Sequence, residues 1–342
     1  MKTAYLQAKT IEATFQQLQN TFGGKFTVDY KEHTLEVDSE LGKGIIKGVP
    51  FKDGITYLEF DMIFYHDFVL SINTPDKNPI YFTYCSKGQL GHSFGETGEQ
   101  RVLGSFQTGI LTSRQAEENL LYFKKDEQLK TTLITVQTTG SANHTDAKGL
   151  KSKLHDTFFK NFDKENFVYI GSHNLKISEK IDQLQAITQK GLVRSLLIQG
   201  LVHVILALEI QQHSDDLKNR SQNTGTLTVS EMATIKTVSD YVNENSESQI
   251  TITDLYSKFG LSPSKLQEGF KLMHGHTVTE YIREVRIKKA EDLLKNTDMN
   301  ISQVVYTIGL TSRSYFSKIF KEKYNCSPKD YKFAQRELAM SA

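Results

Sequence analysis

The chain has 342 residues, of which 38% are hydrophobic and 24% charged, the balance of an ordinary soluble protein. Its length predicts two or three domains, and its formal net charge of +1 excludes a polycation that binds nucleic acid along its whole length. The only two cysteines, Cys85 and Cys326, exclude a disulfide framework and favour a reducing cytoplasm.

The sequence gives no sign of export or of membrane insertion. The start of the chain, MKTAYLQAKTIEATF, has no apolar core long enough for a signal peptide. The longest apolar region, Leu196 to Leu208, is interrupted by Gln199 and His203 and is too short to span a bilayer. We therefore expect a cytoplasmic protein with no membrane partner.

The first predicted element is an amphipathic helix over residues 3 to 22. Its apolar residues Ile11, Phe15, Leu18 and Phe22 fall on one helical face. The glycine pair that follows, at 23 and 24, ends the helix. The pattern indicates packing against the rest of the domain.

Residues 25 to 136 have the composition of strands and turns. Segments rich in β-branched and aromatic residues lie at 54–64, 79–84, 89–94, 104–111 and 129–136, and turn sequences such as Pro75-Asp76, Lys87-Gly88 and Thr97-Gly98 separate them. About eight to ten short strands at nearly regular spacing predict an antiparallel sandwich or barrel, such as a jelly roll.

This β-rich region shows no metal or catalytic pattern. A metal-binding barrel of the cupin kind is expected to carry two His residues at H-x-H spacing followed by Glu, whereas here His92 with Glu96 is the nearest approach and His66 stands alone. We expect His92 to belong to surface chemistry and Cys85 to be a small buried hydrophobe. The sequence therefore predicts no metal, no cofactor and no enzyme activity.

Aromatic residues of the same region are candidates to line an effector pocket. Pocket walls and a packed core both use inward-facing aromatic side chains. Core filling is the favoured interpretation for each candidate, so no effector-binding residue is assigned among Tyr57, Phe60, Phe64, Tyr81, Phe82 and Tyr84.

A helical hairpin around Gly191 is predicted after a polar transition at 140–173, with helices at 177–188 and 192–212. In the second helix four apolar residues recur at spacings of 4, 3 and 4, which is typical of a seam that packs on another helix: Leu197, Leu201, Val204 and Leu208. We predict that this seam dimerises the protein. The alternative, in which it packs only within the chain, stays open at this point.

The polar stretch Ser214 to Thr228, SDDLKNRSQNTGTLT, is the best linker in the chain. A helix over 231–243 follows it. We therefore predict a β-rich domain at residues 1–140, a helical connector and dimerisation region at 141–213, a linker at 214–229 and a helical domain at 230–342.

The stretch from Ile301 to Lys332 reads as helix, tight turn and helix. Gly309 ends the first helix, and Thr311 or Ser312 caps the second. The second helix has the buried face Phe316, Ile319 and Phe320. Its other face carries hydrogen-bond donors and cations on successive turns, which suits entry into a DNA major groove.

The same pattern occurs once before, between Ile252 and Tyr281. Corresponding residues lie 49 apart before the turn and 50 apart after it, as in Ile252 with Ile301, Gly260 with Gly309, Phe270 with Phe320, Lys271 with Lys321, and Tyr281 with Tyr331. A third helix, over 278–294, joins the copies. The region from Lys258 to Lys332 has 14 Lys and Arg against 8 Asp and Glu, so basic charge is concentrated in it.

This double pattern resembles the DNA-binding domain of AraC/XylS-type transcription regulators. The family signature falls on Ile301, Val304, Gly309, Tyr315, Phe316, Phe320, Lys321, Ser327, Pro328 and Tyr331. The chain departs from it at Val305, Leu310, Asn325 and Lys332, and in the first copy at Tyr256, where the family usually has Ala. Asn accepts the left-handed conformation nearly as well as any residue after Gly, so these departures affect packing and leave the fold in place.

The resemblance implies an α+β multidomain fold. Its parts would be an N-terminal antiparallel β barrel or jelly roll (cupin-like), a helical hairpin, and a C-terminal all-α domain with two helix-turn-helix units.

The resemblance also implies which side chains meet DNA. In the first copy Ser264, Gln267 and Glu268 would face the groove, with Lys265 and Lys271 toward the backbone; in the second, Arg313, Ser314, Ser317 and Lys318 would face it, with Lys321 toward phosphate. A carboxylate repels phosphate, so Glu268 would either accept from cytosine or pair with a cation. The joining helix would set the two recognition helices about one turn of DNA apart, roughly 34 Å.

These observations predict a sequence-specific DNA-binding transcription regulator that responds to a small-molecule signal at its N-terminal domain. Its expected partners are double-stranded promoter DNA, a second copy of the chain and, if it activates transcription, RNA polymerase. One alternative is an effector-independent regulator, whose DNA affinity would be indifferent to metabolites. Another is a cupin-type metalloenzyme with an accessory DNA-binding tail, which a tightly bound metal would reveal.

Overall fold

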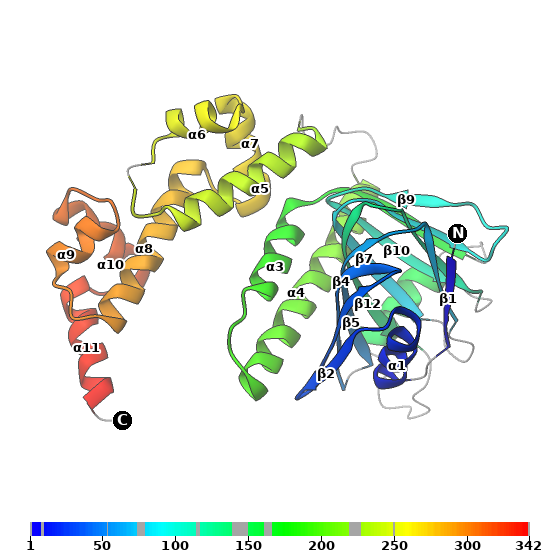
Figure 1. The fold of residues 1–342 in the computed structure, drawn as a ribbon. Helices are drawn as coiled ribbons and strands as arrows, with labels where there is room; N and C mark the ends of the chain where they lie inside the picture. The colour runs from blue at the N-terminus through cyan, green and yellow to red at the C-terminus, as the bar shows by residue number, and fades with distance from the viewer. Residues whose placement is uncertain are drawn as a thin grey trace. The chain divides into compact units, whose positions relative to one another are not determined.

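A computed structural model describes residues 2–7, 10–52, 54–73, 79–113, 117–138, 150–160, 166–218, 227–248 and 250–340. The chain forms two compact units, Met1–Thr224 and Gly225–Ala342 (Figure 1). The turn expected at Pro75-Asp76 and part of the expected linker lie outside the described residues.

Thirteen strands of the described residues form two sheets in the N-terminal unit. The five-stranded sheet has the order β1 (Lys2–Leu6), β6 (Phe68–Ile72), β11 (Asn119–Phe123), β8 (Leu90–Phe94) and β9 (Arg101–Leu103). The eight-stranded sheet has the order β13 (Asn166–His173), β10 (Gln107–Ser113), β7 (Pro79–Lys87), β12 (Gln128–Gln137), β5 (Ile55–Phe64), β4 (Gly42–Pro50), β3 (Glu32–Ser39) and β2 (Lys25–Asp29).

The core of this unit lies between the two sheets. Apolar side chains of both sheets pack into one cluster, in which Phe64 of β5 meets Phe68 of β6 and Phe123 of β11 with ring centroids 5.1 and 4.8 Å apart. The predicted antiparallel β domain is confirmed, with one parallel pair, β1 with β6. The sheets do not close into a barrel, because within the described residues no named strand of one sheet pairs with a strand of the other.

The predicted N-terminal helix is shorter than expected. Helix α1 spans Ile11–Phe22, and the side chain of Thr10 caps it by accepting a hydrogen bond from the Ala13 amide. Residues before the cap form strand β1, in which Ala4 and Leu6 are buried in alternation. Lys2–Leu6 is a strand because its burial alternates with a period of two and it pairs with β6. The prediction of a helix that begins at residue 3 is therefore wrong for this segment.

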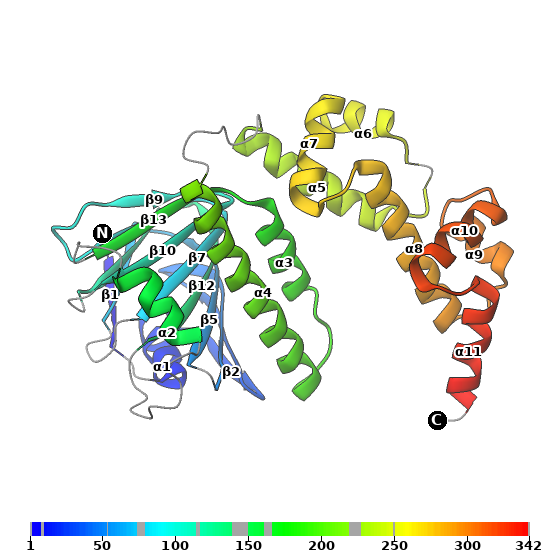
Figure 2. The ribbon, with the colours of Figure 1, turned by 180° about the vertical axis from the view of Figure 1, so that it is seen from behind.

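Two long helices cover the other face of the eight-stranded sheet, after the short α2 (Leu150–His155) and the π-helical turn at Asp156–Lys160. Helix α3 spans Leu175–Gln185 and α4 spans Gly191–Lys218, so a hairpin forms around Gly191 as predicted. Helix α4 runs beyond the predicted end at 212, so the prediction of a linker that begins at 214 is wrong for residues 214–218, which are helical. Figures 1 and 2 show both helices beside strands β7, β12 and β5. Tyr84 of β7 donates a hydrogen bond of 2.7 Å to the Asn174 carbonyl at the start of α3.

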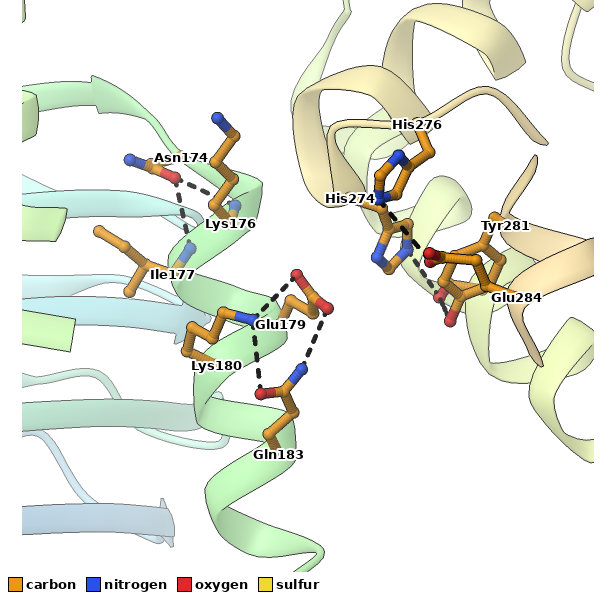
Figure 3. Close-up of polar contacts among 11 residues, drawn as sticks. Asn174, Lys176, Ile177, Glu179, Lys180, Gln183, His274, His276, Tyr281 and Glu284 are labelled. Carbon is orange, nitrogen blue, oxygen red and sulfur yellow. Dashed lines mark hydrogen bonds and ion pairs between the residues drawn. The ribbon is translucent and has the colours of Figure 1, made fainter. Parts of the chain in front are cut away.

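The N-terminus of α3 is fixed by its own cap. The Asn174 side chain accepts hydrogen bonds from the amides of Lys176 and Ile177 at 3.0 and 3.3 Å (Figure 3). One turn further, Lys180 lies close to Glu179 and Gln183. The contacts of Lys180 lie within α3, while Ile177, Ile181 and Leu184 are buried on its apolar side.

A buried carboxyl group lies between α4 and the sheet. Glu209 is 0% exposed, and neither of its oxygens has a hydrogen-bond partner among the described residues. Burial raises the pKa of Glu209 well above its ordinary value, because the charged form cannot be solvated there. Burial, followed by the negative charge of Glu59 and the hydrogen bond that Tyr57 donates to Glu59, raises the pKa of Tyr57 on β5.

Glu209→Gln is expected to make the N-terminal unit more stable above about pH 5. A carboxyl group whose folded-state pKa exceeds its unfolded value binds more protons when folded, so stability falls as the pH rises between the two pKa values, by roughly 1.4 kcal/mol per pH unit. The lowered pKa of buried His92 makes stability rise over part of the same pH range, so each chain is compared with Glu209→Gln. In urea unfolding at pH 5 and pH 8, the natural chain and Glu36→Gln, which changes an exposed carboxylate, should each show this decrease relative to Glu209→Gln. An equal decrease in Glu209→Gln would show that Glu209 does not cause it.

The C-terminal unit is entirely helical within the described residues. Its helices are α5 (Val229–Glu244), α6 (Ile252–Phe259), α7 (Pro263–His274), α8 (Val278–Asn296), α9 (Ile301–Thr307), α10 (Arg313–Tyr324) and α11 (Pro328–Met340). Reciprocal capping boxes begin α5, α6, α8 and α9, at Thr228, Thr251, Thr277 and Asn300. The two predicted helix-turn-helix units are α6–α7 and α9–α10.

The two helix-turn-helix units have the same internal packing. Phe270 and Phe320 correspond at the predicted offset, and both are 0% exposed. At the end of each recognition helix an aromatic residue meets the following helix: the His274 ring stacks on Tyr281 at 4.0 Å (Figure 3), and Tyr324 lies 5.5 Å from Tyr331. This common arrangement shows that the sequence repeat is a structural one.

Candidate nucleic-acid interface

Helix α10 presents one polar face to solvent. The Ser312 side chain caps the helix by accepting from the Tyr315 amide at 3.2 Å, as predicted. Asn325 ends it in the left-handed conformation with φ of 57°, at the position where the family usually has Gly. With Phe316, Ile319 and Phe320 buried on one side, the opposite side carries Arg313, Ser314, Ser317, Lys318 and Lys321.

The polar side chains of this face are available for a ligand. Arg313, Ser314, Lys318 and Lys321 are exposed, and Ser317 is half-buried. Within the part of the chain that the structure describes, none of the five side chains has a hydrogen-bond or ion-pair partner. Three cations and two hydroxyl groups on a single helix face can contact phosphates and the acceptor-rich edges of bases.

Helix α7 differs, because neighbouring elements use part of its polar face. Lys265 forms an ion pair with Glu231 of α5, and this contact lowers the pKa of the Glu231 carboxyl. The Gln267 side-chain oxygen accepts a hydrogen bond of 3.3 Å from the Val278 amide at the start of α8. Ser264 and Lys271 remain exposed, and Glu268 is half-buried.

Residues 255–333, which include α7, α8 and α10, match a family model described as a helix-turn-helix domain. The C-terminal region is a helix-turn-helix domain of the AraC type. The predicted family resemblance is therefore confirmed for this region.

The chain is also similar to parts of curated proteins. The chain is 36% identical over 83 residues to histidine kinase P4 of Formosa agariphila, and the aligned part is 24% of the chain and 6% of the kinase. It is 23% identical over 170 residues to the HTH-type transcriptional activator RhaR of Mannheimia succiniciproducens, which covers 48% of the chain and 61% of RhaR. The chain thus spans less than two thirds of either relative.

One solved structure aligns with most of the chain. The crystal structure of ToxT from Vibrio cholerae in its P21 form aligns with 82% of the chain and 98% of its own length at 18% identity, with a TM-score of 0.29.

The AraC-type domain also exposes side chains to which the sequence analysis assigned no contact with DNA. Tyr306 on α9 is 85% exposed and Tyr315 on α10 is 46% exposed, on either side of the turn that holds Gly309. Tyr306 does not lie on the apolar face of α9. An aromatic residue outside the apolar face of a predicted helix is a sequence signal for an exposed aromatic side chain. Arg283 of α8 is exposed as well.

The predicted dimerisation seam lies on the exposed side of α4. Leu197 and Val204 are 42% and 43% exposed, while Leu201 and Leu208 are half-buried. The opposite side of α4 packs inside the unit through Ile198, Val202, Ile205 and Leu206. Among the described helices α4 alone has the length and hydropathy of a membrane span, a property that helices of soluble proteins share.

Three sequence expectations for the β domain concerned His92, Cys85 and the aromatic candidates. The expectation of surface chemistry at His92 is wrong, because its side chain is 0% exposed, lies 3.2 Å from the Asn119 side-chain oxygen and has its pKa lowered to about 4 by burial. Cys85 is buried, and burial raises its pKa to about 12. All six aromatic candidates are buried as well.

The described residues contain no group of three or more His, Cys, Asp or Glu side chains that could hold a metal ion.

Proposed function

We propose that this protein is a sequence-specific transcription regulator that binds promoter DNA through its AraC-type domain. The observation that carries the proposal is the α10 face, where five polar side chains from Arg313 to Lys321 stand without partners among the described residues. Donors on a short helix match the acceptors of the major groove. RhaR, which shares 170 aligned residues, bears the name of a transcriptional activator.

The proposal extends to the N-terminal unit as a sensor of a small molecule. A cavity of about 490 Å³ at the edge of the sandwich is of the size that small-molecule sites have. Phe94, Arg101, Tyr169 and His213 are among the residues that line it. Tyr169 also donates a hydrogen bond of 2.5 Å to Asp216 near the end of α4, so a ligand in this cavity would contact a side chain bonded to the last turns of the helix.

The proposal places the protein in the cytoplasm and assigns it no enzymatic activity. Its other proposed partners are a second copy of the chain and, for an activator, RNA polymerase. The support for the cytoplasm is the small number of cysteines, since Cys85 and Cys326 are the only two in the sequence.

Selection of bound sequences from random double-stranded DNA tests the function. We expect enrichment of a motif with two half-sites about one helical turn apart, because the two recognition helices would occupy successive major grooves. Operator affinity should also change in the presence of at least one compound of a broad metabolite set. Recovery of DNA without any common motif would contradict sequence-specific binding, and an affinity indifferent to a wide metabolite set would favour the effector-independent alternative.

Dimerisation through α4 is part of the same proposal. Val204→Asp should convert a dimer into a folded monomer. The variant should fold because the exposed Val204 contributes little to the interior of its own unit. Association should weaken by roughly 3 kcal/mol, about 100-fold, because the substitution places a carboxylate in an apolar interface. Sedimentation measures the change. Val28→Asp, at a 52% exposed position on β2, is the matched control and should stay dimeric. A natural chain that sediments as a monomer, or a dimeric Val204→Asp, would rule out this interface.

A further inference from the structure

The two helix-turn-helix units contact each other through the turn between α5 and α6. The described residues of this turn are 245–248 and 250. Arg286, in the middle of α8, donates hydrogen bonds to two of its carbonyl oxygens, to Ser246 at 3.2 Å and to Ser248 at 2.7 Å. Lys289, one turn further along α8, lies 3.7 Å from the Glu247 carboxylate. The joining helix is therefore bonded to a turn that belongs to the first unit.

The same turn rests against the second unit at Gly309. This glycine has φ of 71°, and a Cβ atom added to it would lie 2.7 Å from the Glu247 carbonyl oxygen, closer than a real Cβ contact. Its counterpart Gly260 has nearly the same φ, 70°, but a Cβ there would meet nothing within 4 Å. Gly309 is thus required for close approach of two backbones, in addition to its role in ending α9.

Apolar packing between the two units is incomplete around this contact. A cavity of about 230 Å³ separates residues of the first unit from residues of the second, lined on the two sides by Ile250, Ile252 and Ile282 and by Leu310, Tyr315 and Ile319. The buried residues of α8 are divided between the two units. Ile287, Ala290 and Leu294 belong to the hydrophobic cluster of the second unit, whereas Ile282 does not belong to that cluster. The two units are therefore joined by helix α8 and, beside it, by the contacts of the turn with Arg286 and Gly309.

We propose that Arg286 and Gly309 form an inter-unit clamp that sets the angle between the recognition helices α7 and α10, and so sets which half-site spacing the protein accepts on DNA. Arg286 is a positioning residue in this proposal, because its guanidinium bonds to protein carbonyls and acts on DNA through the turn. The proposal rests on the DNA-binding function proposed above. It adds that spacing selectivity comes from a small set of contacts remote from the base-reading side chains.

The test uses the full-length protein and a duplex obtained by selection, with one or two base pairs inserted between its half-sites. The natural protein should bind the inserted duplexes roughly tenfold or more weakly than the parent, because both helices no longer engage together. Arg286→Met should bind the parent duplex about tenfold more weakly, accept the insertions with little further loss, and bind a single half-site as the natural protein does. Arg286→Lys, which restores one donor, should lie between them.

Lys288→Met is the matched control, because it removes the same charge from an exposed position on the same helix and should keep the natural spacing profile. A second pair of variants tests the clamp where Arg286→Met does not fold. Gly309→Ala and Gly260→Ala impose the same left-handed strain, but only the former crowds the turn. We expect a broadened spacing profile in Gly309→Ala alone.

An unchanged spacing profile in Arg286→Met, equal profiles in the two glycine variants, or a parallel loss of single half-site binding in Arg286→Met would each overturn the clamp. Failure of the natural protein to select any DNA sequence would instead contradict the proposed function itself, so the two failures are distinguishable.

Discussion

Arg313→Ala is expected to abolish most sequence-specific binding by α10 while leaving the affinity for random DNA nearly unchanged. Arg313 is the first residue of the helix and is exposed with no partner among the described residues, and early residues of a recognition helix reach base edges. A bidentate Arg–guanine contact contributes about 1–3 kcal/mol of discrimination. The protein should therefore lose its preference for a particular base at one position of the operator.

Lys321→Ala is the matched variant, because Lys321 lies on the same exposed face two turns further along α10. A cation at that distance from the helix start is expected to contact only phosphate, which every sequence presents alike. Operator and random DNA should weaken together, and the slope of log affinity against log salt should fall by about one.

Binding of both variants to the operator, to its single-base variants and to random DNA across a salt series measures these effects. Parallel weakening of operator and random DNA by Arg313→Ala, with no relaxed position, would show that this residue does not read a base. A Lys321→Ala variant with an unchanged salt slope would place that lysine away from the phosphates.

The helical domain was predictable from the sequence because local signals determine it. Capping residues such as Ser312, a glycine in the left-handed conformation at Gly309, and apolar faces such as that of α10 lie within a few residues of the feature they determine. The internal repeat then provided a second reading of the same pattern, and Leu266, Phe270, Phe316 and Phe320 are all fully buried as the offset requires.

What escaped prediction depends on partners far away in the sequence. Strand β1 pairs with β6, whose residues lie far along the chain, and that pairing decides that Lys2–Leu6 is a strand. Whether the two sheets close into a barrel depends on similar long-range pairing. His92 was assigned to the surface because its partner Asn119 is 27 residues away.

Partners that are distant in the sequence also explain why the polar faces of the two recognition helices differ. The repeat makes α7 and α10 look alike, but the ion pair from Glu231 to Lys265 and the hydrogen bond from the Val278 amide to Gln267 come from outside the pattern. The resemblance assigned both residues to DNA. We expect Lys265 and Gln267 to contribute less to DNA binding than Arg313 and Lys318, whose side chains have no such partners among the described residues.

Phe320→Ala is expected to unfold the second helix-turn-helix unit while the first keeps its structure. Phe320 is 0% exposed, and its ring packs on Phe316, Tyr324 and Tyr331 with centroids 5.5, 4.6 and 5.5 Å apart. Truncating a buried Phe to Ala costs about 3–5 kcal/mol, a large share of the roughly 5–15 kcal/mol that stabilises a domain.

The loss should stay local because the cluster that contains Phe320 draws on the second unit and on the second half of α8 alone. Its members are Ile287, Ala290, Leu294, Val304, Val305, Ile308, Phe316, Ile319 and Phe320. Glu291 of the same half of α8 accepts hydrogen bonds from Tyr324 at 2.5 Å and Tyr331 at 2.7 Å, so these contacts would be lost together with the core.

Amide hydrogen exchange of the full-length protein measures the extent of unfolding. Peptides from α9, α10 and α11 should lose protection in Phe320→Ala, while those from α5, α6 and α7 keep it, and DNA binding should fall to that of a single half-site. Phe333→Ala, which removes a ring that is 64% exposed, is the control and should leave exchange unchanged. Loss of protection across all helices from α5 to α11 would show that the two units fold as one cooperative body, since α8 would then transmit the loss from one core to the other.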